Sequence, residues 1–318
     1  MSTLGAHAGQ RSVDAAGADL PAMAFERERA RLFGLAYRML GSVGDAEDLV
    51  QDAYLRWRRV DVAEIVTPRA YLTTLLTRLC IDRLRHVQLE RAHYPGPWLP
   101  EPLVAGSPEL EHERDETLSL AMLRMLERLA PHERAVFVLR EALDLEYAEI
   151  AAALDAPPAT CRQWYRRARR HLAGERRFDL APAAQMDVLR RLQAALQAGD
   201  VNAIVALLDP AVEARGDGGG KVRAFVRVVT GVERVATVLL HLHRKHRTTQ
   251  QPVWVNGGLG IAQRDGDGAL MAITTIEVAN GRLLYFDAVR NPDKLAHIMI
   301  ASGPGMPAAP GNAGEGEA

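Results

Sequence analysis

Residues 143–172, LDLEYAEIAAALDAPPATCRQWYRRARRHL, decide how the rest of the chain is interpreted, because they carry the pattern of a helix-turn-helix unit. A first helix is predicted by an apolar stripe at the i, i+3, i+4 and i+7 spacing, formed by Tyr147, Ile150, Ala151 and Leu154. Residues 155–158 interrupt it, since proline cannot continue a helix but fits the first turn of the next one. The second helix is strongly basic, with Arg162, Arg166, Arg167, Arg169, Arg170, Arg176 and Arg177. Such a helix favours a DNA phosphate backbone as its partner, with a few side chains in the major groove; the alternative is a solvated basic face on an unrelated helical protein.

Composition limits the class of protein. The chain has 318 residues, enough for two or three domains, and its formal net charge is −1. A nucleic-acid surface must therefore come from local clustering of basic residues. The two cysteines, Cys80 and Cys161, are far apart and predict a reducing compartment without a disulfide framework. No signal peptide and no membrane span is recognised, so we expect a cytoplasmic protein with no membrane partner.

Changes in composition divide the chain. Residues 1–22 and 303–318 are rich in small residues and are expected to be disordered tails. Five prolines between residues 95 and 108 predict an extended linker, placed at 95–112. The sequence therefore predicts helical domains at 23–94 and 113–178 and a last domain at 183–302.

The first domain is predicted to be all-α. One amphipathic helix should end at Gly41, and Asp45 is the expected N-cap of the next, which places Leu49, Ala53 and Trp57 on one face. Thr67 followed by Pro68 predicts the start of a third helix. That helix should bury Leu72, Leu75, Leu76 and Leu79 and expose Arg78, Arg83 and Arg85.

The last domain is predicted to be α+β. Two helices joined at Gly199-Asp200 and a third at 231–247 precede four strand-like segments, VWVNGG, GIAQRD, ALMAITTIEVA and RLLYFDAV. Turn residues such as Asn280-Gly281 separate the strands. We expect helices packed on a curled antiparallel sheet, with a closing helix that starts at Asn291-Pro292.

Two stretches together resemble a known family. RMLGSVGDAEDLVQDAYLRW at 38–57 is similar to region 2 of sigma-70-type initiation factors of the extracytoplasmic-function class. The stretch from Leu126 to Leu154, with the basic helix after it, is similar to their region 4. The resemblance implies two all-α domains that bind core RNA polymerase and promoter DNA, with no catalytic chemistry and no cofactor.

Three further motifs resemble one subgroup, which carries a C-terminal SnoaL-like, ketosteroid-isomerase-type cone domain. They are WLPEP at 98–102, DGGGK at 217–221 and NPDKL at 291–295. The resemblance implies that the cone domain regulates the sigma factor in cis, and we hypothesise that it packs on the linker. The expected contact residues are Trp98, Leu99, Pro100, Asp217, Gly219, Lys221, Asn291, Pro292 and Asp293.

The resemblance also assigns binding surfaces. The polymerase partners would be the β′ clamp and the β flap, and the region 2 surface would be formed by Asp45, Glu47, Asp48, Asp52 and Trp57. Acidic side chains there complement a basic partner, although carboxylates also complement the helix dipole. The loop 61–68 and the helix after it would engage the −10 element, and Arg78 and Arg83 are the DNA-binding candidates on that helix.

In region 4 the family pattern places base readout early in the second helix. The base-reading candidates are Arg162, Gln163 and Arg167. Thr160 would lie near the phosphates at the start of the helix, and Arg166 and Arg170 would contact phosphate or solvent. Arginine pairs with guanine and glutamine with adenine in a bidentate manner. Trp164 and Tyr165 depart from the aliphatic residues common there. One should pack into the domain and the other lie along the DNA backbone.

Other readings remain open. His241, His243 and His246 do not share one helix face and predict no metal site. The glycines at 216–220 lack the P-loop pattern and predict a tight loop against the linker. A pocket Asp, Asp217 or Asp287, would be the general base of an enzyme of the SnoaL-like fold, and the cone is also a possible site for a small apolar ligand. The main alternative is a ligand-responsive helix-turn-helix regulator that never joins polymerase.

Overall fold

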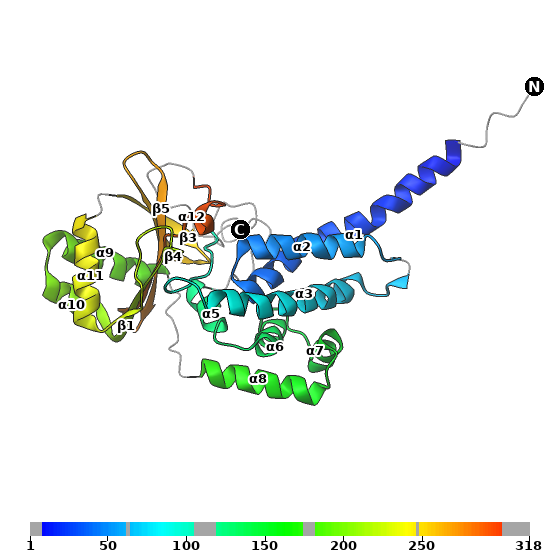
Figure 1. Cartoon of the computed structure of the whole chain (residues 1–318), viewed down its shortest axis with the longest axis horizontal. Helices are drawn as coiled ribbons and strands as arrows, with labels where there is room; N and C mark the ends of the chain where they lie inside the picture. The colour runs from blue at the N-terminus through cyan, green and yellow to red at the C-terminus, as the bar shows by residue number, and fades with distance from the viewer. Residues whose placement is uncertain (1–7, 62–63, 105–118, 174–181, 246–247, 301–318) are drawn as a thin grey trace, which may run out of the picture. The chain divides into compact units, whose positions relative to one another are not determined.

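The computed structural model describes residues 8–61, 64–104, 119–173, 182–245 and 248–300 (Figure 1). It divides into two compact units. The first comprises residues 1–85 and 130–169, and the second comprises residues 86–129 and 170–318. Residues 86–94, the described linker residues and the helix α5 (Leu120–Leu126) therefore belong to the same unit as the last domain.

The first unit is all-α, as predicted. Its helices are α1 (Ala8–Leu40), α2 (Val43–Trp57), most of α3 (Pro68–Arg91), α6 (Pro131–Glu141), α7 (Tyr147–Leu154) and most of α8 (Pro158–Leu172). Gly41 ends α1 with a φ of +67°, and Pro68 begins α3 at the predicted residue. Helix α1 begins at Ala8 and so includes part of the segment 1–22, for which a tail was expected.

Capping of α2 differs from the expectation. The N-cap is Ser42, whose hydroxyl accepts the Asp45 N–H at 3.2 Å. Asp45 lies in the first turn, where its carboxylate complements the helix dipole.

The core of the first unit is mostly apolar, but the side chains of Arg38 and Arg134 are also buried. Trp57 is fully buried, and its Nε1 donates to the Pro21 carbonyl at 2.7 Å. On α6, Arg134 is 1% exposed and donates to the Met39 carbonyl at 2.8 Å. Burial lowers the pKa of Arg134 to about 9. Leu72, Leu76 and Leu79 are buried as predicted, whereas Leu75 is only half-buried.

The second unit contains a six-stranded sheet in the order β2-β1-β6-β5-β4-β3. Its elements are α5 (Leu120–Leu126), α9 (Pro182–Ala198), α10 (Val201–Leu207), β1 (Leu208–Asp217), β2 (Val229–Thr230), α11 (Val232–Lys245), β3 (Thr249–Val255), β4 (Gly258–Arg264), β5 (Leu270–Ala279), β6 (Arg282–Val289) and α12 (Pro292–Leu295). The four predicted strands, β3 to β6, pair antiparallel as expected, whereas β1 was not predicted and pairs with β6 in parallel. The reason is that β1 lies beside a strand distant in sequence, which patterns of neighbouring strands do not reveal.

The two faces of the sheet have different coverings. One face packs on α9, α10 and α11, through residues such as Leu192, Leu239 and Ile276 (Figure 1). The other packs on the linker and on α5, through Leu99 and Leu120. Linker residue Val104 also forms a β-bridge with Val255 on the edge strand β3, which covers that edge. Among the residues described, no helix is both long and apolar enough to span a bilayer.

Trp57→Ala should lower the free energy of unfolding by about 3–5 kcal/mol, because it removes the largest buried side chain of the first unit. Leu55→Ala is the matched control, since Leu55 on the same helix is 48% exposed; its effect should stay within about 0.5 kcal/mol. Urea denaturation followed by circular dichroism measures both. Equal effects of the two substitutions would contradict the buried position of Trp57.

Candidate functional site

Helix α8 presents the predicted DNA-reading side chains to solvent. Cys161 and Ala168 form its buried face. The exposed side chains are Arg162, Gln163, Arg166, Arg167, Arg169 and Arg170, while Thr160 is half-buried. Asp155 adopts a left-handed conformation with φ of +51° at the end of α7, which makes the turn of the motif. Arg176 and Arg177 lie outside the described residues.

Both aromatic residues of α8 pack on their own unit. The ring of Trp164 lies against His132 in a tilted arrangement, with 4.8 Å between the ring centroids. The Tyr165 ring contacts Phe137 and Tyr147, and its hydroxyl donates to Glu141. Both rings are half-buried against residues of α6 and α7, and the expected contact of one of them with the DNA backbone stays a prediction.

Helix α2 exposes three of its four predicted acidic residues, Glu47, Asp48 and Asp52. Asp45 is half-buried and pairs with Arg83 at 3.0 Å. Arg83 is one of the two predicted DNA-binding arginines of α3, and the other, Arg78, donates to the Ala153 carbonyl at 3.1 Å. Trp57 was a wrong choice for a polymerase contact, because its ring has no exposed surface.

A buried carboxylate organises the linker. We call its surroundings the Asp217 cluster, formed by Tyr94, Trp98, Leu99, Asp217, Asn291 and Lys294. The Asp217 side chain has no exposed surface. Its Oδ1 accepts the Tyr94 hydroxyl at 2.6 Å, and its Oδ2 accepts the Leu99 N–H at 2.9 Å and the Lys294 ammonium at 2.8 Å. One carboxylate thus joins the linker to β1 and α12.

Trp98 lies between two cations of this cluster. The Arg91 guanidinium is 3.4 Å from the ring centroid and the Lys294 ammonium is 3.9 Å from it. Lys294 also donates to the Leu99 carbonyl. Burial lowers the pKa of Lys294 to about 8, and the nearby charge of Asp217 opposes that shift. Burial and the hydrogen bond to Asp217 raise the pKa of Tyr94.

The glycine-rich loop fits tightly into the same cluster. Gly219 has a φ of +60°, and a Cβ there would clash with the Asn291 amide. Asn291 donates to the Tyr94 hydroxyl at 3.1 Å and caps α12 by accepting the Asp293 N–H. Lys221 pairs with Asp293 at 2.7 Å on the outside of the loop. The loop lies against the linker, since a Cβ at Gly220 would meet Pro95. The expected regulatory role of the contact residues stays a prediction.

A second polar cluster holds α5, and sequence analysis did not predict it. This Arg124 cluster consists of Arg124, Arg215, Glu277, Tyr285 and Asp287. Arg124 donates to Asp287 Oδ2 at 2.6 Å, and its guanidinium lies 3.9 Å from the Tyr285 ring centroid. Arg215 approaches the other oxygen of Asp287 at 3.4 Å. The alternating polar residues of β6 were the available signal, but their partner lies more than 160 residues away.

Glu277 completes the Arg124 cluster next to the start of α5. It receives hydrogen bonds from the Ala121 N–H and the Ser119 hydroxyl, and Ser119 is the N-cap of α5. Burial raises the pKa of Glu277 to about 7, and the negative charge of Asp287 acts in the same direction. The contact between α5 and the sheet therefore includes a carboxyl group that titrates near neutral pH.

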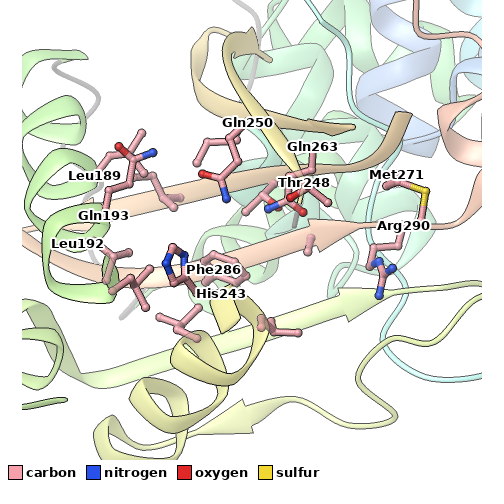
Figure 2. A pocket seen from close by; sticks show the side chains of 17 residues that line it. Leu189, Leu192, Gln193, His243, Thr248, Gln250, Gln263, Met271, Phe286 and Arg290 are labelled. Atoms are coloured by element: carbon pink, nitrogen blue, oxygen red, sulfur yellow. The ribbon is translucent and has the colours of Figure 1, made fainter. Parts of the chain in front are cut away.

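A cavity of about 110 Å³ opens on the helix-covered face of the sheet (Figure 2). Neither Asp217 nor Asp287 lines it. Both are the candidates for a general base, and their side chains contact Tyr94 and Leu99 or Arg124 of α5 instead of this cavity. Among the described residues no group of three or more His, Cys, Asp and Glu side chains has metal-site geometry, and His246 lies outside them.

Known proteins match this chain over most of its length. The family profile "Sigma-70 region 2" matches residues 24–89, and "Sigma-70, region 4" matches residues 119–172. The ECF RNA polymerase sigma factor SigJ of Mycobacterium tuberculosis is 38% identical over 287 residues, which covers 85% of this chain and 91% of that one. The probable ECF RNA polymerase sigma factor SigI of the same species is 33% identical, covering 89% and 97%. A crystal structure of M. tuberculosis SigJ matches with a TM-score of 0.71 at 36% identity, covering 87% and 98%.

The raised pKa of Glu277 predicts a pH-dependent stability. The folded chain binds this proton more tightly than the unfolded chain, so the contribution is complete below about pH 4.5 and is lost as the pH rises through about 7. Between about pH 4.5 and about pH 8, the free energy of unfolding of the wild type should fall by an amount on the order of 2–3 kcal/mol. Thermal unfolding should show that this fall is absent in Glu277→Gln. The control is Glu233→Gln, an exposed position on α11. Parallel pH profiles for the wild type and Glu277→Gln would refute the assignment.

Proposed function

The chain belongs to the extracytoplasmic-function RNA polymerase sigma factors, and from this premise we propose that its C-terminal domain regulates it in cis by holding the linker and the first helix of region 4. The region 4 match begins at Ser119, the N-cap of α5, so the helix bound to the sheet is part of region 4. The single observation that carries the proposal is the Asp217 carboxylate, which accepts the Leu99 N–H and the Tyr94 hydroxyl in a fully buried position.

The contacts support restraint of the linker and α5. Removal of one charged partner from the Asp217 cluster or the Arg124 cluster would leave the other charge buried and unpaired. An unpaired charge in a low-dielectric interior raises the free energy of the folded state. Tyr94, the described linker residues 95–104 and α5 are thus bound to the sheet through ion pairs, hydrogen bonds and apolar burial. Any other surface that binds these segments must compete with the C-terminal domain. The domain would then lower the population of chains competent for transcription.

The polymerase and DNA surfaces follow from the same premise. We place the polymerase contact on the exposed acidic side of α2, with Asp48 and Asp52 facing the β′ clamp, and the −35 contact on Arg162, Gln163 and Arg167 of α8. Region 4 would also reach the β flap. Salt screening applies to these charged surfaces, so association should weaken as ionic strength rises. Arg78 and Arg83 would need to exchange their protein partners in order to bind −10 DNA.

We propose no catalytic role for Asp217 and Asp287. The described residues that line the cavity include His243 but no carboxylate, so neither aspartate supplies a general base there. Turnover of a substrate that disappears in Asp287→Asn, with α5 still bound, would overturn this view.

Reconstituted transcription with bacterial core polymerase tests the sigma assignment of α8. On a template with this gene's own upstream region, the full chain should give promoter-specific transcripts. Arg162→Ala with Gln163→Ala should lower them at least about tenfold, since each bidentate base contact contributes about 1–3 kcal/mol. Binding to core polymerase should be unchanged, and Arg282→Ala, at the exposed start of β6, is the control. DNA binding without transcripts would favour the regulator that never joins polymerase.

Arg124→Met tests restraint by the C-terminal domain. It removes the pair with Asp287 and the contact with Tyr285 while keeping the apolar stem of the side chain. Loss of a contact of about 1–3 kcal/mol should raise transcription from the same template about five- to 150-fold, or to its ceiling. Arg128→Met just beyond α5 is the control. Reduced or unchanged transcription, with normal folding by circular dichroism, would contradict an inhibitory restraint.

A further inference from the structure

The cavity of the C-terminal domain has an apolar interior and a polar edge. Its apolar lining comes from α9, α11 and three strands, through Leu189, Leu192, Leu239, Ile261, Ile276 and Phe286. Glutamines surround it from α9, β3 and β4, namely Gln193, Gln250 and Gln263. Figure 2 shows Arg290 and Met271 at one end and Leu189 and Gln193 at the other. Apolar walls with a few converging polar groups are typical of a small-molecule site.

One cation at this cavity has no acidic partner. Arg290 is half-buried, and its Nη1 donates to the Arg223 carbonyl at 2.5 Å. Among the described residues no carboxylate lies within ion-pair distance of it, and no Asp or Glu lines the cavity. A guanidinium has five N–H donors in a planar fork suited to a carboxylate. Most of these donors are therefore available to an anion.

A buried hydroxyl lies near the same end. Thr274 is 1% exposed and lines the cavity, and its Oγ1 has no hydrogen-bond partner within the described chain. On the sheet it stands directly opposite Ala288, two residues before Arg290. Buried polar groups in proteins are almost always hydrogen-bonded. A ligand oxygen that accepts from Thr274 would satisfy this one.

We propose that this cavity binds a small monocarboxylate with an apolar body, whose carboxylate pairs with Arg290 and accepts the Thr274 hydroxyl. The absence of lining carboxylates disfavours a cationic ligand, and the guanidinium without an acidic partner favours an anion over a neutral molecule. A cavity of about 110 Å³ is slightly smaller than the engineered one of about 150 Å³ that holds benzene. The apolar body is therefore the size of a phenyl ring or a short branched chain.

Binding there would reach the Asp217 cluster through the backbone. The N–H groups of Arg290 and Asn291 both donate to the Asp217 carbonyl, at 2.7 and 2.8 Å. The Asn291 side chain also bonds Tyr94 on the linker. An anion that repositions Arg290 thus acts one residue from the contact that holds the linker. This regulatory consequence rests on the proposed function, whereas the binding site does not.

Calorimetric titration of the full chain with phenylacetate, and with phenylacetamide as the uncharged analogue, tests the site. Phenylacetate should bind and raise the unfolding temperature, and phenylacetamide should bind at least about tenfold more weakly, because it lacks the charge that pairs with arginine. Arg290→Met and Thr274→Val should each weaken phenylacetate binding, Arg290→Met by about tenfold or more. Arg223→Met is the control, since that residue contributes its carbonyl and not its side chain.

Ala288→Leu is a second variant that fills the cavity and leaves Arg290 in place; it should abolish binding. Equal binding of the acid and the amide, unchanged affinity in Arg290→Met, or no binding of phenylacetate at millimolar concentration would overturn the site. A transcription assay with and without phenylacetate then tests the link to regulation. Binding without a change in transcription leaves the site standing and removes only that link.

Discussion

The buried carboxylate of Asp217 is the interaction on which the second unit depends. It sits at the end of β1, accepts hydrogen bonds from the linker at Tyr94 and Leu99, and pairs with Lys294 of α12. A charge without exposed surface is stable only when its hydrogen bonds are complete. Tyr94 and Leu99 therefore supply hydrogen bonds that replace water around the buried Asp217 carboxylate. Fold and linker position are coupled through a single side chain.

One sheet performs two tasks on opposite faces. The helix-covered face forms the cavity, and the other face binds the linker and α5. Alternation of side chains along β6 separates the two, because Phe286 and Ala288 line the cavity while Tyr285 and Asp287 contact α5. A small-molecule site and a protein-binding surface are thus only one residue apart along the strand.

In the first unit, two arginines that are candidates for DNA contact already bond to other parts of the protein. Arg83 pairs with Asp45, and Arg78 donates to the Ala153 carbonyl, although both arginines are candidates for DNA contact. The arginines early in α8 are exposed, and Glu47, Asp48 and Asp52 of α2 are likewise exposed. Arg162 and Arg169 of α8 contact the rings of Tyr147 and Tyr165, so the proposed DNA contacts would require exchange of hydrogen-bonded partners in α3 more than in α8. Charge-assisted hydrogen bonds make that exchange sensitive to salt.

The sequence by itself determined the local structure: the helix-turn-helix at 147–172, the start of α3 at Pro68, the cap at Asn291 and the glycine loop against the linker. These features depend on periodicity, caps and turns within a few residues. Only the tertiary structure decided the parallel pairing of β1 with β6, the burial of Trp57 and the pairing of Arg124 with Asp287. The tertiary structure also decided that Asp217 and Asp287 do not line the cavity. The physical reason is that partners far apart in the chain meet only when the sheet has folded, and no local pattern records which face of the sheet they will share.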